Sequence, residues 1–161
     1  MPKGNRSRGY RAERELVALL WKRGFAVMRA PASGSKVKKA MYPDVVAIRN
    51  GRVAVFEVKS RSREETIYID KEQVMKMIEF TKRAGGSAYI AIRIPGRDWV
   101  FVPIERLEPT GSSYRVGKEV IAEGLSIEQL EVALGLRETL LRYVKPHQDS
   151  DVEATLHDRG Q

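Results

Sequence analysis

Two acids and a lysine lie on the two strands of a predicted β-hairpin. Asn50 and Gly51 stand between two apolar, β-branched runs, which strongly favours a two-residue hairpin turn. With that turn, Asp44 lies directly opposite Glu57, and Lys59 shares the face of Glu57. Opposed carboxylates repel each other unless a positive charge lies between them. We therefore expect a divalent metal at this pair with the lysine beside it, an arrangement suited to phosphodiester hydrolysis.

A third acid precedes the apolar stripe of the first predicted helix. Glu13 comes three, four and seven residues before Leu16, Val17 and Leu20, so it continues their stripe toward the N-terminus. Its carboxylate is expected to lean over one edge of the sheet toward the hairpin acids. Glu15 lies on a different helical face and is expected to be an ordinary surface residue.

The three acids predict a metal site and a division of labour. Carboxylates at Glu13, Asp44 and Glu57 suit Mg²⁺, for which Mn²⁺ would substitute. The ion would lower the pKa of a bound water and polarise the phosphate. Lys59 would position that water or stabilise the extra negative charge of the pentacovalent state.

Each of these residues also has a purely structural explanation. Asp44 is a typical strand-start residue, and Glu57 with Lys59 is a typical charge pair on a half-exposed strand. Glu13 suits the first turn of a helix, where the dipole favours acids. The predicted register and the basic surroundings of all three acids favour the metal site over these separate explanations.

The positive charge is concentrated in the first 63 residues. This part holds 16 lysines and arginines and four acids. The remainder of the chain holds 13 lysines and arginines and 17 acids. Such a footprint indicates a polyanionic partner. Ser33, in a loop of small residues, is expected to contact the scissile phosphate, although a turn role explains it equally well. The side chains expected to hold flanking phosphates are Arg14, Arg29, Lys36, Lys38, Lys39 and Arg61.

Composition excludes several classes of protein. The chain has 161 residues, a net charge of +8 and no cysteine, which rules out disulfides, thiol catalysis and Cys-ligated clusters. No apolar run approaches the roughly 18 residues of a membrane span. No apolar signal core follows the basic N-terminus, so we expect a cytoplasmic protein without membrane contact.

The elements predict an α/β fold in which helices flank a central mixed β-sheet. We expect a basic flexible arm (1–8), one nuclease domain (9–144) and a polar, disordered tail (145–161). The segment 103–117 reads as irregular. Helices are expected at 9–23, at 70–84 and from Ser126, with strands at 25–30, 43–60 (the hairpin), 66–69, 87–93 and 99–102.

These residues resemble two groups of known proteins, one through a short motif and one over most of the chain. Asp44 with the run Glu57-Val58-Lys59 resembles the acid, acid-x-lysine motif of restriction-endonuclease-like nucleases. The segments 9–16 and 24–35, together with 78–80 and the following glycine pair, resemble the archaeal Holliday junction resolvase family over roughly residues 4–142.

The resemblance implies a homodimer that binds four-way DNA junctions by shape and cuts two opposed strands with Mg²⁺. It assigns the metal to Glu13, Asp44 and Glu57, the charge-stabilising role to Lys59, and a catalytic loop serine to Ser33. Arg14 and Arg29 match basic residues tied to DNA binding or activity. The tail is a candidate site for a sliding clamp or a helicase.

Other readings stay open at this point. A nuclease of the same fold could act on flaps, mismatches or a specific duplex sequence, and a basic DNA-binding or ribosome-associated protein would need no catalysis. The dimer has indirect support, because the second predicted helix carries more apolar side chains than one core-facing stripe needs. These are Met75, Met77, Ile78 and Phe80.

Overall fold

The computed structural model describes residues 3–30 and 42–137. None of the helices in this part of the chain is long and apolar enough to cross a membrane. The helices are α1 (Lys3–Lys22), α2 (Lys71–Ala84), α3 (Lys118–Ala122) and α4 (Ile127–Ala133), with a 3₁₀ turn, η2, at Ile104–Arg106. The strands are β1 (Ala26–Arg29), β2 (Val45–Arg49), β3 (Arg52–Ser60), β4 (Ile67–Asp70), β5 (Ser87–Arg93), β6 (Val100–Pro103), β7 (Glu108–Pro109) and β8 (Ser113–Val116).

The central sheet is mixed, as predicted. Its five strands follow the order β1-β2-β3-β5-β6. Strands β3 and β5 are parallel, and α2 lies in the connection between them, whereas the other neighbours are antiparallel. The sheet therefore combines one crossover with hairpin-like pairs.

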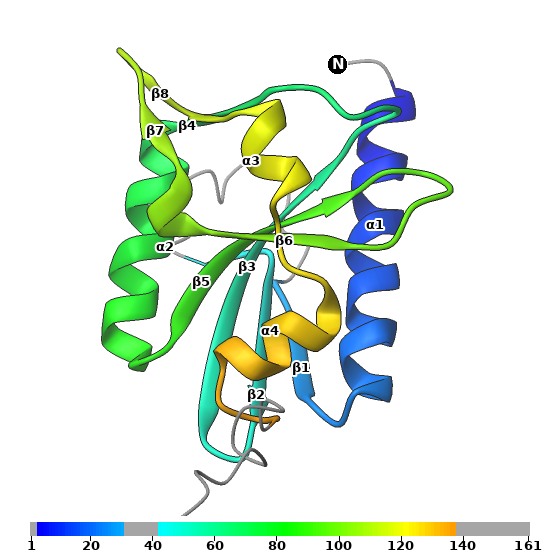
Figure 1. The fold of residues 1–161 in the computed structure, drawn as a ribbon, viewed down its shortest axis with the longest axis vertical. Coiled ribbons are helices and arrows are strands. Elements are labelled where there is room, and N and C mark those ends of the chain that lie inside the picture. Colours follow the sequence, from blue (N-terminus) through cyan, green and yellow to red (C-terminus); the bar gives the residue numbers. More distant parts are fainter. Residues whose placement is uncertain (1–2, 31–41, 138–161) are drawn as a thin grey trace, which may run out of the picture.

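Helices cover both faces of this sheet, so its central strands are buried on both sides. Alternate residues of β3 enter different cores: Val55 packs with α2, whereas Ala54 and Phe56 pack with α1 and α4. Figure 1 shows α1 and α2 flanking the sheet on opposite sides. This two-sided burial explains why the apolar run of β3 is continuous rather than alternating.

The hairpin has the predicted register. Arg49 pairs with Arg52, and Val45 pairs with Phe56. Between the strands, Asn50 and Gly51 adopt φ angles of 50° and 74°. Positive φ at both central residues is the requirement of the type I′ turn that Asn-Gly favours. The turn thus determines which side chains of the two strands meet at the far end of the hairpin.

Two helix boundaries also agree with the sequence. Gly85 ends α2 in the left-handed conformation at φ 69°, as expected of a C-terminal glycine. Ser126 and Gln129 form a reciprocal capping box at the start of α4. Asp70 does stand at the N-cap of α2, but its side chain makes no capping hydrogen bond.

The expected flexible arm at 1–8 is wrong for residues 3–8, which form the first turns of α1. No proline separates Lys3 from the packed part of the helix, and Gly4 and Gly9 are tolerated within it. Because Ala12, Leu16 and Leu20 are buried against the sheet, the nucleus of the helix is already formed, and extension toward the N-terminus costs little.

The segment 103–117, expected to be irregular, contributes β7 and β8 to a second sheet. Its three strands follow the order β4-β8-β7, and α3 comes directly afterwards. Strand β7 has only two residues and α3 only five, too few to show a period. The pairing of β8 with β4 joins segments that are far apart in the sequence, so no local pattern announces it.

Candidate active site

The two hairpin acids lie at the end of the β2–β3 pairing that is far from the Asn50-Gly51 turn. The pairing of Val45 with Phe56 brings the preceding Asp44 and the following Glu57 to the same level. A hydrogen bond joins the two carboxyl groups. The backbone N–H of Val58 donates to Asp44 Oδ2 at 2.8 Å, and that of Ala30 donates to the Asp44 carbonyl at 2.9 Å. Asp44 is therefore held from both sides.

Burial disfavours a negative charge on both acids of this pair at once. Glu57 is 8% exposed, and burial, followed by the charge of Asp44, raises its pKa to about 8. Burial also raises the pKa of Asp44, against the opposing effect of its hydrogen bond from Val58. Lys59 Nζ lies 3.4 Å from Glu57 Oε1 and favours the ionised forms. Both shifts favour protonation within this pair.

Glu13 approaches this pair from α1. Burial, and then the negative charge of Asp44, raise its pKa to about 6, while Arg29 opposes the shift. Arg29 Nη1 lies 3.8 Å from Glu13 Oε2. That Nη1 atom is buried without a hydrogen-bond partner among the described residues, and the guanidinium lies 5.8 Å from the ring centroid of Tyr10.

The donor chemistry of these acids fits a divalent cation. Glu57 is buried, Asp44 beside it is half-buried, and the pKa of each is raised, so a bound cation would stabilise both carboxylates. Within residues 3–30 and 42–137, no three acids or histidines lie close enough together to hold a metal. Glu13 is accordingly paired with Arg29 rather than joined to the other two acids.

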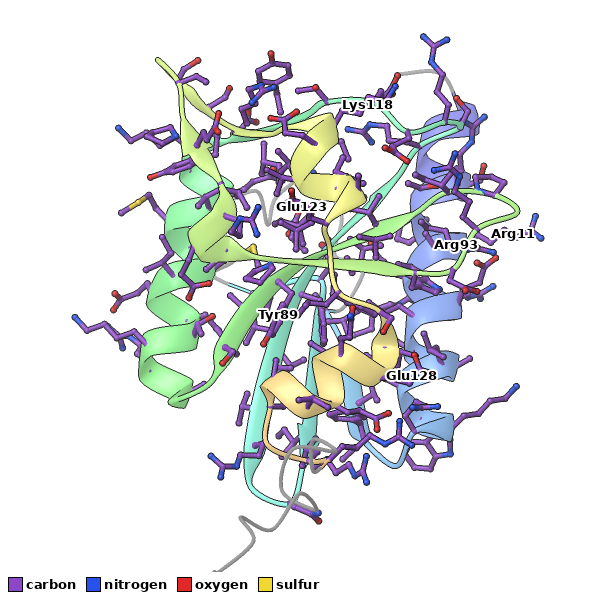
Figure 2. The ribbon with its side chains drawn as sticks, viewed as in Figure 1. Arg11, Tyr89, Arg93, Lys118, Glu123 and Glu128 are labelled. Atoms are coloured by element: carbon purple, nitrogen blue, oxygen red, sulfur yellow. The ribbon has the colours of Figure 1, made fainter. Side chains whose placement is uncertain are left out.

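Glu15 is not the ordinary surface residue that was expected. It accepts a hydrogen bond of 2.7 Å from Arg93 Nε at the end of β5 and lies 3.3 Å from Arg11 Nε. The bond from Arg93 lowers the pKa of Glu15, whereas burial raises that of Glu13. Figure 2 shows Arg11 and Arg93 close together beside α1.

The structure places the remaining predicted site residues in different surroundings, and some of them lie outside the described residues. Arg14 is exposed on α1. Arg61 donates from Nη1 to the Ser60 carbonyl at 2.9 Å and lies 3.6 Å from Glu65. The structure thus leaves Arg14 accessible and ties Arg61 to its own loop. Four predicted residues lie outside the described part of the chain: Ser33, Lys36, Lys38 and Lys39.

Sequence reasoning missed two residues that surround the acids. Tyr10 lies three positions before Glu13, so the same helical stripe would have pointed to it. Arg93 gave no comparable signal, because its bond to Glu15 joins positions 78 residues apart. Long-range ion pairs of this kind leave no trace in local spacing.

Comparison with known proteins places this geometry in a family. The family model described as archaeal Holliday junction resolvase (Hjc) matches residues 4–138. Crossover junction endodeoxyribonucleases Hjc from Sulfurisphaera tokodaii and Sulfolobus acidocaldarius are 41% and 39% identical over 127 residues, which is 78% of this chain and 87% of each relative.

A solved structure gives the same result. Archaeoglobus fulgidus Hjc, described as a Holliday junction resolvase from an archaeal hyperthermophile, matches with a TM-score of 0.67 and 31% identity. The match covers 81% of this chain and 98% of that one. The mixed sheet with its flanking helices is thus a restriction-endonuclease-like nuclease core, and nucleases of this kind generally use a divalent metal. The chain belongs to the archaeal Holliday junction resolvase family.

Proposed function

We propose that this protein is a structure-selective endonuclease that resolves four-way DNA junctions by cutting two opposed strands. The observation that carries the proposal is the hydrogen-bonded pair of half-buried Asp44 and buried Glu57, with Lys59 Nζ 3.4 Å from Glu57. In a chain of this family, that trio is a nuclease site rather than a structural ion pair. We further propose that the protein acts in homologous recombination and repair and is located in the cytoplasm.

In this proposal, Asp44, Glu57 and Glu13 hold Mg²⁺, and Mn²⁺ substitutes for it. The bound ion supplies an acidic water and polarises the scissile phosphate. Val58 keeps one Asp44 oxygen fixed through its N–H, and a bound cation would favour the ionised form of Glu57. Lys59 remains beside Glu57 and stabilises the additional negative charge on the phosphate as the bond breaks.

The basic first part of the chain supports DNA as the substrate. We propose that Arg14 and Arg29, the latter beside Glu13, contact phosphates on either side of the cut. Ser33 is proposed to contact the scissile phosphate. Further phosphate contacts are proposed for Lys36, Lys38, Lys39 and Arg61. A clamp or helicase that binds residues 145–161 stays a prediction, because that segment lies outside the described residues.

We also propose a homodimer, since two cuts related by a two-fold axis need two sites. On α2, Met75 and Ile78 are 49% and 40% exposed. Met28 and Ile48 are exposed on the paired strands β1 and β2. These exposed apolar side chains are the candidates for the dimer interface. Met77 is buried and Phe80 packs against the core, so neither is free for a partner.

Sedimentation velocity tests the dimer. The variants Met75→Glu and Ile78→Glu would place charges on the proposed surface and should shift the protein toward the monomer. Tyr68→Glu is the matched control, because Tyr68 is 60% exposed but lies on β4, in the second sheet. An equal shift in the control, or a monomeric parent protein, would contradict the proposed interface.

Cleavage of a junction with fixed arms, compared with linear duplexes of the same sequence, tests the function. We expect symmetric paired cuts in the junction only, and no cuts by Asp44→Asn or Glu57→Gln, both of which should still bind the junction. Equal cutting of junction and duplex would instead indicate a nuclease for flaps, mismatches or duplex. Full function in both variants would indicate a non-catalytic DNA-binding protein.

A further inference from the structure

Two ion pairs hold α1 from opposite sides of its axis. Glu13 faces Arg29 on the edge strand β1 at 3.8 Å, and Glu15 bonds Arg93 on β5 at 2.7 Å. Strands β2 and β3, which lead to the hydrogen-bonded acids, lie between β1 and β5 in the sheet. The helix is therefore fixed across the strands whose ends carry the reactive carboxylates.

Arg93 is a rigid anchor for this contact. Its Nη1 donates to the carbonyls of Ile94 and Arg97 at 3.0 and 2.7 Å, and its guanidinium lies 5.9 Å from the ring centroid of Trp99. Only Nε is directed at Glu15. A guanidinium held by two carbonyls and an aromatic ring has little conformational freedom. Its hydrogen bond to Glu15 therefore fixes where α1 lies, in addition to balancing charge.

The backbone of Arg93 is also joined to the strand of the site. The Arg93 carbonyl accepts the N–H of Arg61 at 3.0 Å, two residues after Lys59. The same strand pairing places Lys59 opposite Ile92 and Ser60 opposite Arg93. One residue therefore connects α1, through its side chain, to the end of β3, through its backbone.

We propose that Glu15 and Arg93 are positioning residues that fix the rotation of α1 and thereby present Glu13 to the metal held by Asp44 and Glu57. This proposal rests on the proposed function above. Neither residue touches the metal or the DNA in this role. Their loss should reduce metal affinity and turnover while leaving the recognition of the junction unchanged.

The Mn²⁺ affinity of the protein without DNA, measured by electron paramagnetic resonance, tests the proposal. The two explanations differ in whether each substitution raises or lowers this affinity. Simple electrostatics predicts that Glu15→Gln weakens cation binding, whereas Arg93→Gln, which removes a positive charge, strengthens it. Positioning predicts that both variants weaken it by about tenfold, as loss of outer partners of metal ligands does. The double variant should lose no more than either single variant.

Arg11→Gln is the matched control, since Arg11 is the exposed partner of Glu15 and has no bond to the sheet among the described contacts. It should leave Mn²⁺ binding unchanged. With junction as substrate, the two positioning variants should lower kcat and leave KM, and binding in Ca²⁺, at parental values. If Arg93→Gln fails to fold, Arg93→Lys retains the charge and should still weaken Mn²⁺ binding, because a lysine cannot reproduce the fixed Nε contact.

Opposite effects of Glu15→Gln and Arg93→Gln on Mn²⁺ binding, or no effect of either, would overturn the positioning role. A parental protein that binds no Mn²⁺ would instead refute the proposed function. In that case the metal-free side-chain carboxyl ¹³C shift of Glu13 decides the positioning role. The shift should change in Glu15→Gln and Arg93→Gln and stay constant in Arg11→Gln, and an unchanged shift in all three would overturn it.

Discussion

Asp44 and Glu57, on adjacent antiparallel segments, share a hydrogen bond between their carboxyl groups, with Lys59 only 3.4 Å from Glu57. The pair is held together in the fold although two negative charges there would repel. The site therefore carries a cost in stability that depends on protonation, and this cost is measurable.

The first prediction concerns the pH dependence of stability. The pKa of Glu57 is about 8 in the folded protein and 4.5 in the unfolded chain. The folded state thus binds the proton more tightly, and the resulting stability is complete below pH 4.5 and is lost as the pH rises through 8. Glu57→Gln, a permanently neutral mimic, should gain stability relative to the parent with rising pH, by at most about 1.4 kcal/mol per pH unit.

Urea unfolding of both proteins in EDTA, from pH 5 to pH 9, measures this difference. Because the titrations of Asp44 and Glu57 depend on each other, the difference between the two curves reports the pair as a unit. A difference that is constant with pH, or a parent that becomes relatively more stable at pH 9, would contradict the raised pKa.

The second prediction separates Lys59 from the acids. Lys59→Met should lower the single-turnover rate of junction cleavage by about 10²- to 10³-fold, the usual effect of removing a group that stabilises the transition state. Mn²⁺ binding should persist, since the acids remain and a repelling charge is gone. Lys82→Met, an exposed change on α2, is the control and should cut at the parental rate. Loss of Mn²⁺ binding in Lys59→Met would show that the lysine organises the metal site instead.

The third prediction concerns a buried acid far from the active site in the sequence. Glu131 is 3% exposed; Arg23 donates a hydrogen bond to it, and Arg137 and Arg49 lie 3.4 and 3.8 Å away. Glu131→Gln should destabilise the fold by about 2–3 kcal/mol in urea unfolding, because it removes the one buried charge that these arginines surround. Glu128→Gln, which removes only an exposed partner of Arg23 at 3.7 Å, should change stability by less than about 0.5 kcal/mol. Equal effects would show that Glu131 is not the centre of this cluster.

The fourth prediction tests the packing of β3 against the end of α2. A Cβ atom at Gly86 would lie 2.4 Å from the Val53 carbonyl oxygen, so Gly86→Ala should destabilise the fold by about 1–3 kcal/mol. Gly111→Ala, where an added Cβ meets nothing within 4 Å, should be close to neutral. Thermal unfolding monitored by circular dichroism compares the two, and a neutral Gly86→Ala would show that the strand can shift at no cost.

The hairpin and its acids were predictable from the sequence because their chemistry is local. Asn50 and Gly51 specify the turn, the turn specifies the register, and the register brings Asp44 to the level of Glu57. Helical spacing predicted that Glu13 continues the sheet-facing stripe of α1, and the structure pairs it there with Arg29; its role as a metal ligand stays a prediction. In each case the residues that must be placed relative to each other lie within about two helical turns or one hairpin of sequence. Over that range the period of a helix or strand predicts which side chains share a face.

The rest of the fold depends on contacts that spacing does not encode. The small sheet β4-β8-β7 pairs Ile67 with Val116, and the fixing of α1 depends on Glu15 meeting Arg93. The helical residues 3–8 were missed for a different reason: polar composition suggested an arm, but the buried part of α1 extends the helix regardless of composition. The expected serine and lysines of 31–41 lie outside the described residues and stay predictions.

The late position of α4 in the chain has a consequence during protein synthesis. Leu130 and Leu134 pack into the same cluster as Leu16 and Leu20 of α1, and ion pairs join positions 78 and 108 residues apart. A polypeptide still emerging from the ribosome has therefore made α1 long before it has the partners that hold this helix in place. Helix α1 therefore cannot gain its full set of packing partners until almost the whole described domain has been translated.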